Sequence, residues 1–430
     1  MNTGILEAMR LTREGKLAEA TALIQRTLKG GHAPPSAPVG QASSVEPIAL
    51  TGPVATEAAD TDQATSSEAS AAASEAQPRS TIHARARRMP TGRPFVPPLK
   101  PPVESRVPGL EGLFGRGPVL QPTPVDLAGP GQWIAGTHTS AAGKRDYKLY
   151  IPSGYRGQAL PLVVMLHGCT QSPDDFAAGT GMNAMAEAEG FLVAYPAQAP
   201  TANPSKCWNW FDATHQQRDG GEPTLIAGIT RQVMAQYSID PGRIYVAGLS
   251  AGGAMAAILG ATYPDLYAAV GVHSGLAPGC AQDLPSAFQA MQQGGSGGQQ
   301  TRMGRLPPLI LFHGDGDSTV HPCNADHLVQ QWTATDGSPG PGESAPPVTV
   351  QQGQVPGGRA YTCEIYHDIR GQAVVERWTV HGAGHAWSGG SRHGSYTDPV
   401  GPDASRELVR FFQEHPRGLA APWPEAKRPR

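Results

Sequence analysis

The sequence predicts an α/β fold with a doubly wound, mainly parallel β-sheet. Two observations lead to this expectation. Runs of β-branched and aliphatic residues alternate with runs of helical spacing across residues 131–418, and such alternation is typical of parallel sheets covered by helices on both faces. In addition, the strand-like run at residues 243–249 leads through one short turn directly into an alanine-rich helical run.

The predicted elements follow one another in a regular order from about Gln132. Strands are predicted at residues 147–152, 160–168, 191–196, 243–249, 268–272, 309–312, 361–366 and 374–380, where β-branched, aliphatic and aromatic residues gather. Helices are predicted at residues 174–189, 224–234, 251–263 and 404–415, from apolar residues at helical spacing. We expect one domain, residues 131–418, to contain them all.

The chain outside this domain has a different character. Residues 1–31 carry apolar residues at helical spacing, broken at Gly15 and ended at Gly30-Gly31, which predicts a helical hairpin. Such a hairpin cannot bury its own apolar face, so we expect it to dock, to self-associate or to bind an apolar surface. Residues 32–130 are rich in Ala, Ser, Pro, Thr and Glu and predict a disordered linker. Residues 419–430 predict a disordered tail.

Composition and charge exclude several classes of function. The formal net charge of −3 gives no reason to expect a nucleic-acid partner. No apolar run is long enough to predict a transmembrane segment. Charged residues such as Glu7, Arg10 and Arg13 interrupt the N-terminus, so no secretory signal is predicted and a cytoplasmic location is expected. The five cysteines permit one or two disulfides or none, and no pair has zinc-finger spacing, so no metal site is expected.

The turn between the strand and the helix reads Gly248-Leu249-Ser250-Ala251-Gly252. A G-x-S-x-G in this context is typical of the nucleophile elbow of the α/β-hydrolase fold, which presents the serine at the edge of the sheet. The alternative is a serine that caps an ordinary helix. The similar run Gly271-Val272-His273-Ser274-Gly275 has the wrong glycine spacing, and we interpret it as the end of a strand.

A serine nucleophile needs a base and an acid that orients the base. In α/β-hydrolases these follow in the order Ser, Asp or Glu, His. Two carboxylates compete for the acid after the strand at residues 309–312, and we favour Asp317 over Asp315, which we expect to form a turn. For the base we favour His385 over His381, which lies at a strand end, and over His393, which lies in a Gly/Ser loop.

The oxyanion of an acyl-transfer intermediate needs N–H donors. We expect one from the backbone of Ala251, after the nucleophile, and one from the backbone of Cys169, in the loop after the strand at residues 160–168. Trp208, Trp210 and Trp387 are candidates for the walls of a substrate site. For the first two, packing in the core explains the aromatic cluster equally well.

Five motifs together resemble the polyhydroxybutyrate (PHB) depolymerase family of esterases. They are Val164–Gln171, Cys207-Trp208-Asn209-Trp210-Phe211, Ala247–Met255, His313-Gly314-x-x-Asp317 and Gly384-His385-Ala386-Trp387. The resemblance implies an α/β-hydrolase that cleaves ester bonds of poly(3-hydroxybutyrate) through an acyl-enzyme, without a metal or organic cofactor. It also implies kinship with feruloyl and acetylxylan esterases.

Three functions follow as alternatives. The first is a serine esterase acting on short-chain polyhydroxyalkanoate or its oligomers, and the second is a feruloyl- or acetylxylan-type carbohydrate esterase. The third, from another class, is a granule- or partner-binding protein in which residues 1–130 do the work and the hairpin binds a granule surface or self-associates. The complete catalytic set argues against the third. Many members of the family are exported, so an extracellular location is the alternative to a cytoplasmic one.

Overall fold

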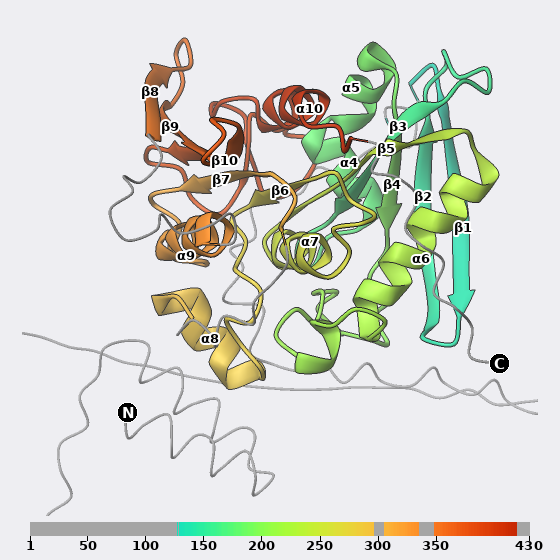
Figure 1. Cartoon of the computed structure of the whole chain (residues 1–430), viewed down its shortest axis with the longest axis horizontal. Coiled ribbons are helices and arrows are strands. Elements are labelled where there is room, and N and C mark those ends of the chain that lie inside the picture. Colours follow the sequence, from blue (N-terminus) through green and yellow to red (C-terminus); the bar gives the residue numbers. More distant parts are fainter. Residues whose placement is uncertain (1–126, 128, 296–304, 335–347, 419–430) are drawn as a thin grey trace, which may run out of the picture. The chain divides into compact units, whose positions relative to one another are not determined.

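The computed structural model describes residue 127 and residues 129–295, 305–334 and 348–418. The predicted hairpin at residues 1–31, nearly all of the predicted linker and the tail at residues 419–430 lie outside the described residues. The domain boundaries and the loop expected near residues 294–300 therefore stay predictions. The described part of the chain forms a large sheet with helices on both faces (Figure 1).

Within the described residues the main sheet has ten strands in the order β1-β2-β4-β3-β5-β6-β7-β10-β9-β8. The six from β4 to β10 in this order run parallel, and antiparallel pairs complete both edges. The bounds are β1 Gln132–Ser140, β2 Gly143–Ile151, β3 Leu160–Leu166, β4 Leu192–Pro196, β5 Ile239–Leu249, β6 Ala269–His273, β7 Leu309–Gly314, β8 Val348–Gln354, β9 Ala360–His367 and β10 Ala373–Val380. The short strands β11 (Trp387–Ser388) and β12 (Thr397–Asp398) pair separately.

Helices cover both faces of this sheet (Figure 1). On one face lie α6 (Gly221–Gln236), α7 (Ala251–Thr262) and α9 (Cys323–Thr333), and on the other lie α4 (Pro173–Thr180), α5 (Met182–Glu189) and α10 (Ala404–Glu414). The alternating side chains of β3 feed two cores, since Leu162 and Val164 pack on the α6 and α7 side and Val163 on the other. The predicted α/β-hydrolase fold is confirmed.

The structure differs from the sequence-based expectation at several elements. The helix expected over residues 174–189 is two helices, because Gly181 adopts φ 64° and ends α4 in the left-handed conformation. The strands β1 and β8 and the helices α8 (Leu284–Gln293) and α9 were not predicted. All residues of β8 are exposed or half-buried, so it lacks the apolar alternation that marks a strand in sequence. The run Gly271–Gly275 does end a strand, as expected, because β6 stops at His273.

Candidate active site

Ser250 lies at the turn between β5 and α7, in a backbone conformation of φ 59° and ψ −121° that non-glycine residues rarely adopt. Close packing enforces this turn. A Cβ on Gly252 would collide with the carbonyl oxygen of Leu166, and one on Gly248 would collide with the backbone of Gly252. The Ser250 side chain makes no hydrogen bond that caps α7. The alternative of an ordinary capping serine is therefore wrong, and the hydroxyl is not engaged by the helix that follows it.

Asp317 and His385 meet at the same edge of the sheet. His385 Nδ1 lies 2.7 Å from Asp317 Oδ2, and the backbone N–H groups of Thr319 and Val320 both donate to Asp317 Oδ1 at 2.9 Å. Burial by itself would raise the pKa of the Asp317 carboxyl, but hydrogen bonds from His313 and His385 outweigh burial and hold that pKa well below its ordinary value. Asp317 is therefore an anion placed to accept a hydrogen bond from Nδ1–H of His385, and in that tautomer the other ring nitrogen, Nε2, carries the free lone pair.

Ser250 and His385 line one small pocket, together with Gly168, Cys169, Leu249 and Tyr396. We call it the Ser250 pocket. Three of the five residues predicted to perform chemistry thus share a cavity, and a fourth, Asp317, binds one of them. Their catalytic roles stay predictions.

The two residues expected to donate to the oxyanion lie beside Ser250, and both line a second pocket together with it. Ala251 is the first residue of α7, where a helix leaves its N–H groups without partners. Cys169 lines the Ser250 pocket, and its backbone N–H makes no hydrogen bond to any other residue in the described part of the chain. The sequence left the pairing of the cysteines open, and the structure joins Cys169 to Cys207 in a disulfide. The thiol of Cys169 is therefore unavailable as a nucleophile.

Residues 145–340 match the family described as Esterase PHB depolymerase. This segment of the chain is therefore similar to that family of esterases. Poly(3-hydroxyalkanoate) depolymerase C of Paucimonas lemoignei is 35% identical over 247 residues, which cover 55% of this chain and 57% of that protein.

Carbohydrate esterases are also similar to this part of the chain. Feruloyl esterase B of Thermothelomyces thermophilus is 33% identical over 192 residues, or 40% of this chain and 64% of that protein. Acetylxylan esterase A of Talaromyces purpureogenus is 30% identical over 227 residues, or 49% of this chain and 58% of that protein. The chain thus spans between 57% and 64% of the length of these three relatives.

Two of the three tryptophans predicted to form walls of the substrate site lie elsewhere in the domain. Trp208 is fully buried and its indole N–H donates to the His167 carbonyl at 3.1 Å. Trp387 is also buried, stacked on His273 and hydrogen-bonded to Ser405 Oγ at 3.1 Å. Both tryptophans are core residues, because their polar indole nitrogens find partners inside the domain. Neither lines the pockets beside Ser250.

Trp210 does line a second pocket beside Ser250, which we call the apolar pocket. The side chains that give it its character are Trp210, Phe211, Leu276, Leu284, Phe288 and Met291. Three of these come from α8, which the sequence did not predict as a helix. The apolar periodicity that would indicate this helix in the sequence is weak, because the helix has ten residues and only Ala287 and Ala290 are buried.

Asp315 does more than form a turn in this domain. Its carboxylate accepts from Gly382 N at 2.6 Å and lies 2.8 Å from His381 Nδ1. These contacts tie the loop that carries Asp317 to the loop that carries His385. His381 is therefore hydrogen-bonded to Asp315 and does not line the Ser250 pocket. His393 contacts Ser391 Oγ at 3.0 Å. The preference for Asp317 and His385 over these neighbours agrees with the geometry.

Tyr396 is a residue of the Ser250 pocket that the sequence did not single out. It has φ 53°, and its hydroxyl lies 3.1 Å from Thr170 Oγ1, on another residue with positive φ (68°). Strained backbone of this kind gathers at functional sites. Its position in a Gly/Ser-rich loop, 11 residues after His385, gave no pattern to recognise.

In the described part of this domain, no group of three or more His, Cys, Asp or Glu residues is arranged to hold a metal ion. Among the same residues, none of the helices has the length and apolar character needed to cross a bilayer.

Proposed function

We propose that this domain hydrolyses carboxylic esters through an acyl-enzyme formed on Ser250. The observation that carries the proposal is the Asp317–His385 hydrogen bond beside the pocket that Ser250 and His385 share. An anionic, buried Asp317 holds the His385 ring with Nδ1–H toward the carboxylate. Nε2 is then the nitrogen available to take a proton from the Ser250 hydroxyl.

The reaction proceeds in two halves. Ser250 Oγ attacks the ester carbonyl while His385 Nε2 takes its proton, and the carbonyl oxygen becomes an oxyanion that accepts from the N–H groups of Ala251 and Cys169. The intermediate collapses, the alcohol leaves with the proton from His385, and the acyl group stays on Ser250. Water then attacks the acyl-enzyme with His385 as base, which releases the acid and restores Ser250.

The proposed substrate is short-chain polyhydroxyalkanoate, including poly(3-hydroxybutyrate), or its oligomers. The apolar pocket supports this choice, because aliphatic and aromatic side chains from α8 and from Trp210 and Phe211 adjoin Ser250, a surface suited to aliphatic acyl units. The name of the Paucimonas lemoignei relative agrees with it. The feruloyl and acetylxylan esterases among the relatives favour the second candidate, a carbohydrate esterase.

One set of assays tests the proposal. Ser250→Ala is expected to lower kcat on a soluble hydroxybutyrate oligomer by about a million-fold with the fold intact. Retention of near-normal hydrolysis would refute the assignment. Side-by-side kcat/KM values on hydroxybutyrate oligomers, feruloyl sugars and acetylated xylan separate the two esterase candidates, and a strong preference for the sugars would replace the first by the second.

Deletion of residues 1–128 separates an esterase from a granule- or partner-binding protein. We expect the shortened chain to keep hydrolysis of the soluble oligomer, since all proposed catalytic residues lie in the domain. The role proposed for the predicted hairpin at residues 1–31, self-association or attachment to a granule surface, predicts that only those properties are lost.

Of the two locations considered, the Cys169–Cys207 disulfide favours an extracellular or other oxidising compartment, because disulfides persist there and are rare in the cytosol. Fractionation of native cells tests this, with a reduced, cytosolic chain as the result that contradicts it.

A further inference from the structure

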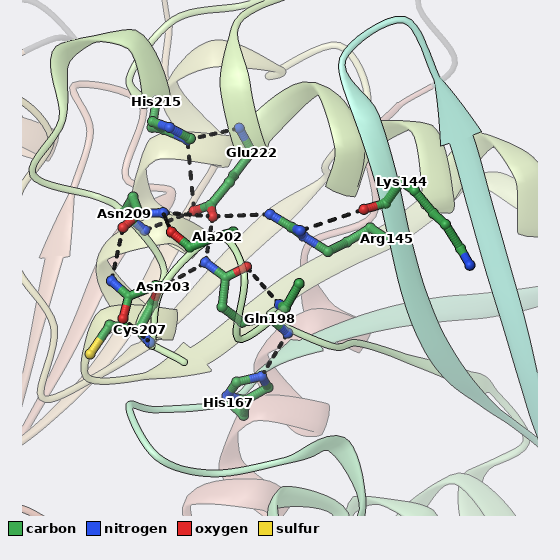
Figure 2. Close-up of polar contacts among 11 residues, drawn as sticks. Lys144, Arg145, His167, Gln198, Ala202, Asn203, Cys207, Asn209, His215 and Glu222 are labelled. Atoms are coloured by element: carbon green, nitrogen blue, oxygen red, sulfur yellow. Dashed lines mark hydrogen bonds and ion pairs between the residues drawn. The ribbon is translucent and has the colours of Figure 1, made fainter. Parts of the chain in front are cut away.

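Glu222 is a buried carboxylate that the proposed reaction does not use. It lies in the first turn of α6 with 1% of its surface exposed. Arg145 of β2, itself 6% exposed, donates from Nη2 to Glu222 Oε1 at 3.1 Å. Figure 2 shows the carboxylate at the centre of a network that reaches from the β1–β2 hairpin to His167.

The remaining partners of Glu222 all belong to the segment between β4 and α6. Asn209 donates to it twice, from its backbone N to Oε2 at 2.7 Å and from its side-chain Nδ2 to Oε1 at 3.0 Å. Gln198 Nε2 donates to Oε1 as well. Both carboxylate oxygens therefore accept hydrogen bonds, from Arg145 and from residues 198 and 209 of one loop (Figure 2). His215 of the same segment lies 3.8 Å from Oε2 through its Nδ1, which also accepts from the Glu222 backbone N–H at 3.0 Å.

Cys207 lies between those two points. Gln198 Nε2 also donates to the carbonyl of Cys207 at 2.8 Å, and Cys207 is bonded to Cys169. The position of the residue expected to donate to the oxyanion thus depends on a loop that is held by Glu222.

A second connection leads to the same place through His167. Gln198 N donates to His167 Nε2 at 3.1 Å, and His167 Nδ1 lies 2.8 Å from the carbonyl oxygen of Gly168. Burial lowers the pKa of His167 to about 4, so the ring is neutral, with Nε2 as acceptor and Nδ1–H as donor. This chain of hydrogen bonds runs from Glu222 through Gln198 to the peptide unit immediately before Cys169.

We propose that Glu222 is a positioning residue for the oxyanion site, which it holds through Gln198, Asn209 and the Cys169–Cys207 bond. This inference rests on the proposed function. A charged carboxylate suits the role because both of its oxygens accept hydrogen bonds. A glutamine would instead place its NH₂ group, a hydrogen-bond donor, against the donors of Arg145 or against the backbone N–H of Asn209. An oxyanion donor acts mainly in the transition state, so its displacement lowers kcat more than it raises KM.

The test compares Glu222→Gln and Asn209→Ala with a matched control, Glu376→Gln. Glu376 is also a buried carboxylate, 4% exposed, and it accepts from Arg410 and from the Trp378 indole on the face that carries α10. Glu222→Gln is expected to lower kcat on a soluble hydroxybutyrate ester at least tenfold with KM within threefold, since displacement by about 1 Å can cost a hundred-fold in rate. The control is expected to keep kcat within twofold.

Asn209→Ala keeps the Arg145–Glu222 pair and removes the side-chain hydrogen bonds of Asn209 to Glu222, to Asn203 and to the Ala202 carbonyl oxygen, so it gives a result even if Glu222→Gln fails to fold. We expect it to lower kcat severalfold with an unchanged KM. The proposal is overturned if the folded variants keep kcat within twofold, if KM rises as much as kcat falls, or if Glu376→Gln loses as much. Ser250→Ala in the same assay separates the two claims, because an active Ser250→Ala refutes the proposed function itself.

Discussion

The disulfide between Cys169 and Cys207 allows a quantitative prediction. We consider the double variant Cys169→Ser/Cys207→Ser. The bond closes a loop with a sequence separation of 38 residues, and the chain-entropy relation gives about 4 kcal/mol of stability at 25 °C for a loop of that length. At about 2–4 °C per kcal/mol for a large domain, the melting temperature is expected to fall by roughly 8–16 °C.

Thermal melts of the wild type and the double variant, each with and without reductant, test this figure. Reductant is expected to lower the melting temperature of the wild type and to leave that of the double variant unchanged. Cys323→Ser serves as the control, because Cys323 is a free and half-buried cysteine. A drop below about 2 °C, with thiol alkylation showing that the bond was reduced, would refute the reasoning from loop closure.

The same variant is expected to lose activity beyond its loss of stability. Cys169 lines the Ser250 pocket, and without the bond its backbone is held by hydrogen bonds of the neighbouring residues only, such as Thr170 N to Ser205 O at 2.7 Å. At a temperature where the variant is fully folded, we expect kcat to fall about tenfold. An unchanged kcat would show that the disulfide stabilises the domain without ordering the oxyanion site.

Three further predictions concern the acid and the corrected tryptophan. Asp317→Asn is expected to lower kcat by about 10⁴ with little change in KM, because the amide favours the wrong tautomer of His385; a loss below tenfold would point to another acid. The pKa of Asp317 is lower in the folded chain than its value of about 3.9 in the unfolded chain. The ionised carboxylate therefore stabilises the fold above about pH 3.9, and this stabilisation declines as the pH falls below that value. Denaturant melts of wild type and Asp317→Asn at pH 3 and pH 6 are expected to differ more at pH 6. Trp387→Phe is expected to cost about 2 kcal/mol of stability with KM unchanged, and a raised KM on oligomers would restore it as a substrate wall.

The sheet and the candidate catalytic residues could be predicted because their signals are local. Ser250 lies between a buried strand and a helix, and collisions at Gly248 and Gly252 explain why glycine is needed on both sides. Asp317 and His385 each follow a strand, β7 and β10, that are neighbours in parallel. Parallel neighbours end at one edge of the sheet, so chain order was enough to expect these two side chains together.

The substrate walls and the cysteine pairing could not be predicted, because they depend on contacts between distant segments. Trp387 follows the candidate base by two residues, but its indole packs inward on His273 and reaches Ser405. Nothing in the local sequence distinguishes that orientation from one toward the pocket. Cys169 and Cys207 are 38 residues apart in sequence, and only the folded chain brings them together. The residues that form hydrogen bonds around them, such as Gln198, carry no pattern in sequence that would indicate the pairing.

Polar contacts hold one part of the site, and apolar side chains form another. The loops with Asp317 and His385 are joined by several polar contacts, including Gly316 N to Ala383 O at 3.0 Å and Gly382 N to Asp315. The apolar pocket instead receives Leu284, Phe288 and Met291 from α8 as apolar contacts. Substitution among apolar residues on α8 can change the shape of the pocket without breaking a hydrogen bond of the acid or the base. Under the proposed function, substitutions on α8 are expected to change substrate preference while the contacts of Asp317 and His385 stay the same.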